Sequence, residues 1–225
     1  GREEQNMNCV EKRELVRRAL LLYAITDRSW VGKMTLYEQV KASLDGGITL
    51  LQLREKDMPD DEFLREAKDM KALAASYRVP FIINDNVGIA LAVDADGVHV
   101  GQSDMEAGSA REKLGPDKII GVSARTVEQA LQAEKMGAAY LGVGAVFSTS
   151  TKEDADVISR ETLQEICRAV SIPVVAIGGI KKENLMQLAG SGAAGVSVIS
   201  GIYGQPDIRK ACEELLALAK EMTEK

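Results

Sequence analysis

Short apolar runs alternate along the chain with longer stretches in which apolar residues recur at helical spacing. The eight runs that have the length of a buried strand are Leu20–Thr26, Leu50–Leu53, Phe81–Asn84, Gly97–Val100, Ile119–Ser123, Tyr140–Val143, Val174–Ile177 and Gly195–Ile199. Between them lie amphipathic stretches such as Asp60–Tyr77, Thr126–Met136, Ser159–Val170 and Pro206–Met222. Apolar residues every three or four positions are typical of helices packed on a core. Strand, helix and strand at this rhythm predict parallel pairing.

A weak internal repeat supports the same interpretation. The stretches Asp45-Gly-Gly-Ile-Thr-Leu-Leu, Met136-Gly-Ala-Ala-Tyr-Leu-Gly and Ser191-Gly-Ala-Ala-Gly-Val-Ser each place a glycine before an apolar run. We interpret each glycine as a helix C-cap that leads into a strand. Division of 225 residues into eight units leaves about 28 residues for a strand, a helix and two short loops, which suits a barrel.

We therefore predict a single closed (β/α)8 TIM barrel of class α/β. The structural alternative is a doubly wound open sheet, which would show a Gly-rich fingerprint after its first strand. The chain instead has Thr26-Asp-Arg-Ser-Trp-Val-Gly there. Residues 20–225 are assigned to the barrel and residues 1–19 to a short N-terminal helical extension. A helix from Asn8 to Arg18 would either cover the lower end of the barrel or lie solvated.

Composition narrows the classes of partner. Lys and Arg number 28 against 34 Asp and Glu, a net charge of −6, so nucleic-acid or acidic-membrane binding lacks its usual electrostatic basis. An anionic ligand therefore needs a local cluster of cations. The three cysteines are odd in number and widely spaced, which predicts a reducing cytoplasm rather than a disulfide framework or a zinc site. Neither a membrane span nor a signal peptide is indicated.

In a parallel barrel the active site forms where the strands end, so the polar residues that close each run are the informative ones. These are Gln52-Leu-Arg54-Glu-Lys56, Asn84-Asp85, His99 with Gly101-Gln102-Ser-Asp104, Ser123, Ser148-Thr149-Ser150-Thr151-Lys152, Gly178-Gly179 and Ser200-Gly201. Arg54, Lys56 and Lys152 are cations, and the amides of glycine turns bind anions when a helix follows. Asp85 and Asp104 suit a magnesium ion. Together these groups predict a site for phosphate esters and a diphosphate.

Each of these features has a simpler explanation. Gly178-Gly179 alone would be a tight turn, but at strand seven, beside Ser200-Gly201 at strand eight, a phosphate cup is the better interpretation. Arg54 and Lys56 would be a solvated charge run without the barrel register, although alternation puts Gln52, Arg54 and Lys56 on one side of an extended chain. Either aspartate could instead cap the helix after its strand.

Three further residues receive structural roles. His99 lies between two valines, so we interpret it as a satisfied core histidine that supports the site from behind. Asp94 and Asp96 precede a strand and therefore fall at the end of the barrel opposite to the site.

The sequence resembles the thiamine-phosphate synthase family over nearly the whole chain from about Leu20. The stretches that carry the resemblance are Leu22-Tyr23-Ala-Ile-Thr26-Asp27, Gln52-Leu-Arg54-Glu55-Lys56, Ile83-Asn84-Asp85, Asp96-Gly-Val-His99-Val-Gly101-Gln102-Ser-Asp104, Gly121-Val-Ser123, Thr149-Ser-Thr151-Lys152, Ala176-Ile-Gly178-Gly179-Ile180 and Val196-Ser-Val-Ile199-Ser200. Their order and spacing together are highly specific.

The resemblance implies a transferase that joins 4-amino-2-methyl-5-hydroxymethylpyrimidine diphosphate to hydroxyethylthiazole phosphate, giving thiamine phosphate and diphosphate. It implies that the pyrimidine diphosphate is held by Gln52, Leu53, Arg54, Glu55, Lys56, Asn84, Ser123 and Lys152. Within that set it implies catalytic roles for Arg54, Lys56, Ser123 and Lys152. Thr149, Ser150, Thr151, Gly179, Ile199 and Ser200 would bind the thiazole phosphate, and Asp85 with Asp104 would hold Mg²⁺. The partners would be these two small molecules, and the oligomeric state stays open.

Two departures from the family pattern bear on the alternatives. Ser148 precedes Thr149 where the family often has proline, which loosens a turn at most. Arg125 stands where related barrels that tautomerise a thiazole carboxylate phosphate depend on a histidine, which argues against that activity. A non-catalytic regulatory barrel is the remaining alternative, and such a protein should have lost a carboxylate or a cation of the site. The intact Arg54-Glu55-Lys56 motif favours the synthase.

Overall fold

Eight parallel strands close into a barrel in the computed structural model, which describes residues 2–102, 104–149 and 156–225. The strands pair in chain order, and β1 pairs with both β2 and β8. Their bounds are β1 Leu22–Ile25, β2 Leu50–Leu53, β3 Phe81–Asn84, β4 Gly97–Val100, β5 Ile119–Ala124, β6 Tyr140–Gly144, β7 Val174–Ile177 and β8 Gly195–Val198. The closed barrel confirms the predicted fold class and excludes the open doubly wound sheet.

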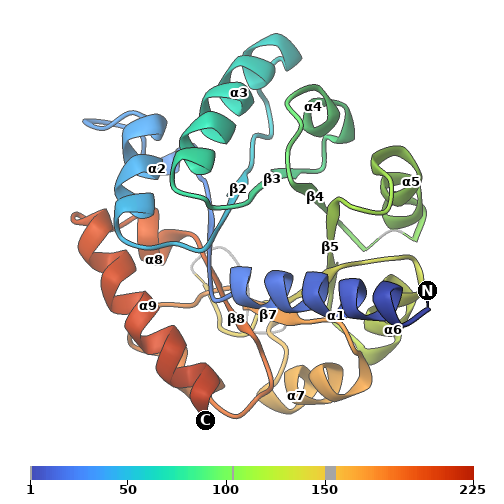
Figure 1. The fold of residues 1–225 in the computed structure, drawn as a ribbon. Coiled ribbons are helices and arrows are strands. Elements are labelled where there is room, and N and C mark those ends of the chain that lie inside the picture. Colours follow the sequence, from blue (N-terminus) through green and yellow to red (C-terminus); the bar gives the residue numbers. More distant parts are fainter. Residues whose placement is uncertain (1, 103, 150–155) are drawn as a thin grey trace.

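Helices surround the barrel as an outer ring (Figure 1). They are α2 Leu36–Asp45, α3 Asp60–Ser76, α4 Val87–Ala92, α5 Asp104–Leu114, α6 Val127–Lys135, α7 Arg160–Ala169, α8 Ser200–Tyr203 and α9 Ile208–Glu224, with the 3₁₀ turns η1 Arg28–Trp30 and η3 Leu185–Leu188. Side chains cap several of them, as when Thr35 and Glu38 form a capping box at the start of α2. No helix in these described ranges is long and apolar enough to cross a membrane.

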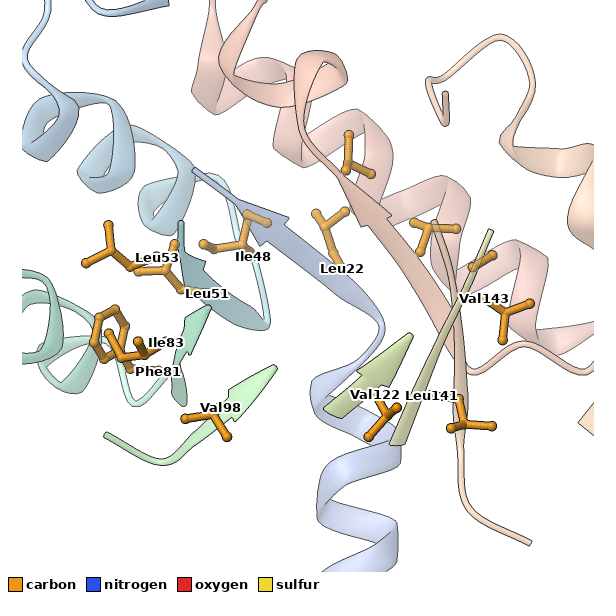
Figure 2. Packing of buried hydrophobic residues seen from close by; sticks show 14 of the residues in the cluster. Leu22, Ile48, Leu51, Leu53, Phe81, Ile83, Val98, Val122, Leu141 and Val143 are labelled. Atoms are coloured by element: carbon orange, nitrogen blue, oxygen red, sulfur yellow. The ribbon is translucent and has the colours of Figure 1, made fainter. Parts of the chain in front are cut away.

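The strands are buried on both faces, which is why they read as continuous apolar runs in the sequence. Along β1, Leu22 and Ala24 belong to the cluster between the sheet and the helices, whereas Tyr23 and Ile25 belong to a second cluster inside the barrel. Figure 2 shows Leu22 of the first cluster together with Leu51, Leu53, Phe81, Ile83 and others from neighbouring strands. Alternate residues of every strand therefore face the barrel interior, where the functional side chains lie.

The N-terminal helix α1 (Arg2–Ala19) crosses one opening of the barrel (Figure 1). Its last turns contribute Val16 and Ala19, which pack against the cluster inside the barrel, while Val10 and Leu15 are exposed. The amide of Leu20 still bonds to the carbonyl of Val16 at 3.1 Å, so β1 begins at Leu22 rather than at Leu20. Because α1 precedes β1 directly, it lies at the amino end of the strands and leaves the carboxyl end open.

The repeated glycines have the left-handed backbone that the C-cap interpretation requires. Gly47, Gly137 and Gly192 have φ angles of 99°, 96° and 95°, which residues with a side chain rarely adopt. The interpretation is wrong in one respect. The glycine before β8 follows the 3₁₀ turn η3 and not an α-helix, because only four residues between β7 and β8 are helical.

Candidate active site

The carboxyl ends of β2 and β3 form one pocket with a volume of about 670 Å³. Arg54 and Lys56 line it from the loop after β2, and Asn84 and Asp85 line it from the end of β3. A second hollow of about 390 Å³ lies on the other side of the same loop. With Glu55, which also lines the pocket, the structure brings together five of the residues that were assigned to the site from the sequence. Lys113 and Asp60 line the pocket as well, and this mixture of cations and carboxylates suits an anion that arrives with a divalent metal.

The loop after β2 is held by the end of β1. Thr26 is buried, its hydroxyl accepts the amide of Arg54 at 3.0 Å, and its own amide donates to the carbonyl of Gln52 at 3.0 Å. These two bonds continue the strand pairing past the end of β1. They fix the main chain from which the Arg54 side chain leaves the sheet.

Glu55 has a role that the sequence did not reveal. Its side chain is only 4% exposed, and its two carboxylate oxygens accept Nε of Arg28 at 2.8 and 2.9 Å. Arg28 also donates through Nη2 to Glu66 of α3 at 2.8 Å. Glu55 is therefore committed to Arg28 of the β1–α2 connection, and it braces the loop that carries Arg54 and Lys56.

The carboxylates of Glu55 and Glu66 share the guanidinium group of Arg28. Burial, reinforced by the neighbouring Glu55, raises the pKa of Glu66 to about 7, against the opposing effect of Arg28. The second oxygen of Glu66, Oε1, is buried without a hydrogen-bond partner among the described atoms. Neither Arg28 nor Glu66 could be found from the sequence, because nothing local links positions 28, 55 and 66, which meet only when β1 pairs with β2 and α3 packs beside them.

Asp85 has a left-handed backbone, with φ 62°. Its amide donates to the carbonyl of His99 at 2.9 Å, and its side chain is exposed in the pocket. The helix α4 is capped by Asn86, whose Oδ1 accepts the amide of Ile89 at 2.9 Å, so capping does not explain Asp85. A non-glycine residue in this conformation costs free energy and is often found where function requires it.

The residues present fit a magnesium ion that is shared with a phosphate ligand. Asp104 is the first residue of α5, and its side chain lies outside the described part of the structure. Among the described residues no group of three or more His, Cys, Asp and Glu side chains could hold a metal by itself. Mg²⁺ is commonly held by one or two carboxylates with phosphate oxygens and waters, and Asp85 beside the two cations offers such a position.

The amides of Gln52 and Asn84 meet inside the barrel. Gln52 is 2% exposed, and its Oε1 accepts Nδ2 of Asn84 at 2.9 Å. Leu53 points the other way, into the cluster between sheet and helices, so only its main chain can reach a ligand. Ser123 lies within β5, and its hydroxyl bonds to Nε2 of His99 at 2.9 Å.

His99 is a satisfied interior histidine, as the sequence indicated. Its Nδ1 bonds to the hydroxyl of Tyr140 at 2.9 Å, and its Nε2 bonds to Ser123. Burial lowers the pKa of His99 to about 4, so the ring is neutral near pH 7. The ring therefore contacts a site residue without supplying charge. The sequence does not single out Tyr140, because an aromatic residue in an apolar run is also what core packing requires.

A glycine turn follows β7, and the short helix α8 follows β8, both at the same end of the barrel. Gly178 and Gly179 have φ angles of 103° and 67°, and Nδ2 of Asn184 holds the carbonyl of Gly179 at 2.9 Å. Ile199 precedes α8, and its side chain packs on the interior cluster. In the described part of the chain the amides of Gly179 and Ser200 have no acceptor. Amides in this arrangement suit a phosphate.

The other predicted residues lie in the loops after β5 and β6 and at the amino end of the barrel. Thr149 follows β6, whereas Ser150, Thr151 and Lys152 lie outside the described residues. Arg125 follows β5 and donates through Nη2 to the carbonyl of Asp156 at 2.8 Å. Asp96 accepts the amide of Phe81 at 2.7 Å, and Asp94 pairs with Lys118 at 2.6 Å, both at the amino end of the strands. The last two contacts agree with the structural roles given to these aspartates.

The chain is similar to known proteins in both sequence and fold. Residues 22–202 match the family model described as thiamine monophosphate synthase. The chain is 52% identical to thiamine-phosphate synthase of Ruminiclostridium cellulolyticum, over 88% of this chain and 94% of that protein. It is 50% identical to the Clostridium tetani enzyme of the same name, over 89% and 96%. The solved structure of thiamine phosphate pyrophosphorylase from Pyrococcus furiosus has a TM-score of 0.84 at 44% identity and covers 92% of this chain and 98% of that one.

Proposed function

Because the chain belongs to the thiamine monophosphate synthase family, we propose that the carboxyl end of its barrel binds the two substrates of the synthase reaction at two separate anion sites. The enzyme condenses 4-amino-2-methyl-5-hydroxymethylpyrimidine diphosphate with hydroxyethylthiazole phosphate, giving thiamine phosphate and diphosphate. The alternatives of a thiazole tautomerase or a regulatory barrel receive no support from these relatives. One anion site serves each of the two substrates.

The first anion site takes the diphosphate of the pyrimidine substrate. The observation that carries this assignment is the shared pocket of Arg54, Lys56, Asn84 and Asp85. Arg54 and Lys56 neutralise the diphosphate, and Lys152 from the β6 loop is the third cation of the proposal. Gln52, Asn84 and Ser123 hold the pyrimidine ring, and Glu55 acts through its contact with Arg28.

The second anion site takes the phosphate of the thiazole substrate. Its groups are the amides of Gly179 and Ser200, together with Ile199 and the β6-loop residues Thr149, Ser150 and Thr151. The support is the pair of amides without an acceptor in the described chain, at the ends of two neighbouring strands. Barrels commonly bind phosphate after their seventh and eighth strands.

The reaction proposed for this geometry begins with departure of the diphosphate. The bond between the pyrimidine methylene carbon and the diphosphate oxygen breaks, its electron pair leaves with the diphosphate, and the aminopyrimidine stabilises the cation that remains. The thiazole nitrogen then forms the new bond to that carbon, and the positive charge passes to the thiazolium ring. No protein nucleophile is needed. Arg54, Lys56 and Lys152 stabilise the charge that develops on the leaving group, and the second site aligns the thiazole.

Mg²⁺ completes the proposal as a cofactor held by Asp85 and Asp104. When bound, it supplies positive charge to the departing diphosphate. Asp85 fits this role because it is exposed beside the two cations and is not used to cap α4. Its left-handed backbone turns the chain sharply at the end of β3.

To test the two proposed anion sites, the purified chain is incubated with both substrates and Mg²⁺, and the thiamine phosphate formed is measured by chromatography. Arg54→Ala should lose most of the turnover while Arg65→Ala, an exposed change on the outer helix α3, keeps it. Equal activity of the two variants would rule out the proposed diphosphate site. No product from the parent chain would contradict the function itself.

We also propose that the enzyme works in the cytoplasm. Cys9, Cys167 and Cys212 are free cysteines. These thiols suit a reducing compartment, and the two phosphorylated substrates are metabolites that cells retain by their charge.

A further inference from the structure

Six polar side chains inside the barrel form one continuous hydrogen-bonded row. Each of the strands β1 to β6 contributes one of them, and the two ends of the row are residues of the proposed pyrimidine site. The bonds run Asn84 Nδ2 to Gln52 Oε1 (2.9 Å), Gln52 Nε2 to Tyr23 Oη (2.7 Å), Tyr23 Oη to Tyr140 Oη (2.7 Å), Tyr140 Oη to His99 Nδ1 (2.9 Å) and His99 Nε2 to Ser123 Oγ (2.9 Å). We call these six residues the polar row.

The middle of the polar row is sealed from water. Tyr23 and Tyr140 are 1% and 0% exposed, and they pack in the apolar cluster inside the barrel. The strands are shaped around them, since a Cβ at Gly121 would lie 2.0 Å from Cζ of Tyr140. A Cβ at Gly142 would lie 3.2 Å from Cε1 of His99. A buried hydroxyl in such a cluster has only its neighbours in the row as partners.

Because each of these groups has so few partners, the direction of every hydrogen bond in the polar row is determined. Nε2 of Gln52 is an amide nitrogen and only donates, so the hydroxyl proton of Tyr23 must point to Tyr140. The proton of Tyr140 then points to Nδ1 of His99, which must be the unprotonated nitrogen. Nε2 of His99 therefore carries the ring proton and donates it to Ser123. The hydroxyl proton of Ser123 is left to point into the site.

The same counting applies at the opposite end. Asn84 donates one amide hydrogen into the polar row, so its carbonyl oxygen remains free to accept a bond from a ligand. The hydroxyl proton of Ser123 is available to a ligand only while His99 donates its own hydrogen bond to the Ser123 oxygen. Rotating the amides of Gln52 and Asn84 would reverse all five bonds at once. Because all five bonds would have to exchange together, the group that Asn84 presents to a ligand is coupled to the group that Ser123 presents at the other end.

We propose that Tyr23, Tyr140 and His99 are positioning residues that fix this direction, so that the site accepts an amino group at Asn84 and donates a hydrogen bond at Ser123. The inference rests on the proposed function, because it takes the aminopyrimidine as the ligand between these two ends. An aminopyrimidine offers an amino donor and ring-nitrogen or diphosphate-oxygen acceptors, and it matches the row as it stands. A 4-oxo pyrimidine presents an acceptor in place of the donor, which sets two acceptor oxygens against each other at Asn84 Oδ1 unless the row reverses.

The variant that isolates the row is Tyr140→Phe, which removes one hydroxyl and keeps the ring that packs in the cluster. Without that hydroxyl, Nδ1 of His99 no longer accepts a hydrogen bond from Tyr140. The ring can then carry its proton on either nitrogen. Loss of one such bond should lower kcat/KM for the aminopyrimidine substrate by roughly 2- to 12-fold. A matched control is Tyr203→Phe, since Tyr203 is equally buried but bonds to Ser43 outside the barrel at 2.9 Å.

The specificity readout compares kcat/KM for the amino substrate and its 4-oxo analogue in each variant. The amino group also aids the chemistry, but that intrinsic difference is the same in every variant and cancels when the ratios are compared. Tyr140→Phe should reduce the preference for the amino substrate at least about tenfold, because a site with fixed polar groups rejects a mismatched ligand far more strongly than one that adapts. Tyr203→Phe should leave the preference unchanged. An unchanged preference in Tyr140→Phe would overturn the proposal.

A direct readout comes from His99, which is the only histidine of the chain. Nitrogen-15 spectra of the labelled, ligand-free parent protein at pH 7.5 should show one neutral ring with the proton on Nε2, and Tyr140→Phe should show both tautomers. A parent ring protonated on Nδ1 would reverse the row and contradict the proposal. Tyr23→Phe keeps the proton of Tyr140 available to His99 and serves as a second variant if Tyr140→Phe does not fold. The spectra need no substrate, so this outcome is independent of whether the chain makes thiamine phosphate.

Discussion

Replacing Gly179 with alanine perturbs the proposed thiazole phosphate site by a single carbon atom. Gly179 has a φ angle of 67°, and a Cβ there would lie 2.8 Å from the carbonyl oxygen of Phe147 and 3.0 Å from its carbonyl carbon. These neighbours are main-chain atoms next to β6, so they cannot rotate away as a flexible side chain could. The turn must shift, and the amide of Gly179 shifts with it.

The expected cost has two parts. An L-residue in the left-handed region costs about 1–2 kcal/mol of folding free energy. A displaced amide loses a hydrogen bond to a charged phosphate, worth about 1.5–3 kcal/mol, which corresponds to a rise in KM for the thiazole phosphate of roughly 10- to 150-fold. The KM for the pyrimidine diphosphate should stay nearly unchanged, because Arg54 and Lys56 line a different pocket.

Steady-state kinetics with each substrate varied in turn measures both constants. Gly115→Ala is the matched control, because Gly115 has a φ angle of 83° but a Cβ there meets nothing within 4 Å. It follows α5 on the way to β5, at the end of the barrel opposite to the site. Gly115→Ala should therefore lower the unfolding free energy by a similar amount, about 1–2 kcal/mol of backbone strain, and leave both KM values unchanged.

Two results would refute this reasoning. If Gly179→Ala loses stability like Gly115→Ala but binds the thiazole phosphate normally, the turn after β7 is only a structural turn. If it instead weakens the pyrimidine diphosphate, the two anion sites have been exchanged.

The remaining predictions concern the cations, the metal and the contact of Glu66 with Arg28. Arg54→Ala should lower kcat by roughly 10²- to 10³-fold and Arg54→Lys should restore only part of it, because a lysine lacks the planar fork of donors; equal activity of Arg54→Lys and the parent in steady-state assays would rule that geometry out. Asp85→Asn should weaken Mg²⁺ binding in the presence of diphosphate at least about tenfold in calorimetry, and undiminished linkage between metal and diphosphate would remove Asp85 from the metal site. Since the folded-state pKa of Glu66 is raised from 4.5 to about 7, its stabilising contribution is complete below pH 4.5 and is lost as the pH rises through 7; Glu66→Gln should therefore gain stability relative to the parent between pH 5 and pH 8 in urea unfolding, and a constant difference would contradict the raised pKa.

The sequence was most informative where one local pattern decides the structure. The bounds of β2, β3, β4 and β7 are those predicted, because buried parallel strands appear as short apolar runs closed by polar residues. The ends of β1 could not be read in the same way. Leu20 is apolar and fully buried, yet it lies in the turn directly after α1, and apolar character does not distinguish such a turn residue from the first residue of a strand.

The grouping of candidate residues at the ends of β2 and β3 could be predicted from the sequence, whereas their contacts could not. The sequence could predict that Arg54, Lys56, Asn84 and Asp85 lie together, because the carboxyl ends of the strands meet at one end of a barrel regardless of side-chain contacts. The contact of Glu55 with Arg28 depends on the path of two loops, and that of Tyr23 with Tyr140 on two strands that face each other across the interior. Pairing of β1 with β2 creates the first pair and the curvature of the barrel creates the second, and no local spacing encodes either of them.

Two separate anion sites at the carboxyl end of one barrel are the central feature of the proposed enzyme. A crystal structure of the chain with thiamine phosphate, diphosphate and Mg²⁺ bound tests their separation most directly. We predict the diphosphate between Arg54 and Lys56 with the metal on Asp85, and the ester phosphate of the product on the amides of Gly179 and Ser200. A product phosphate held by Arg54, or a diphosphate resting on Gly179, would contradict this prediction.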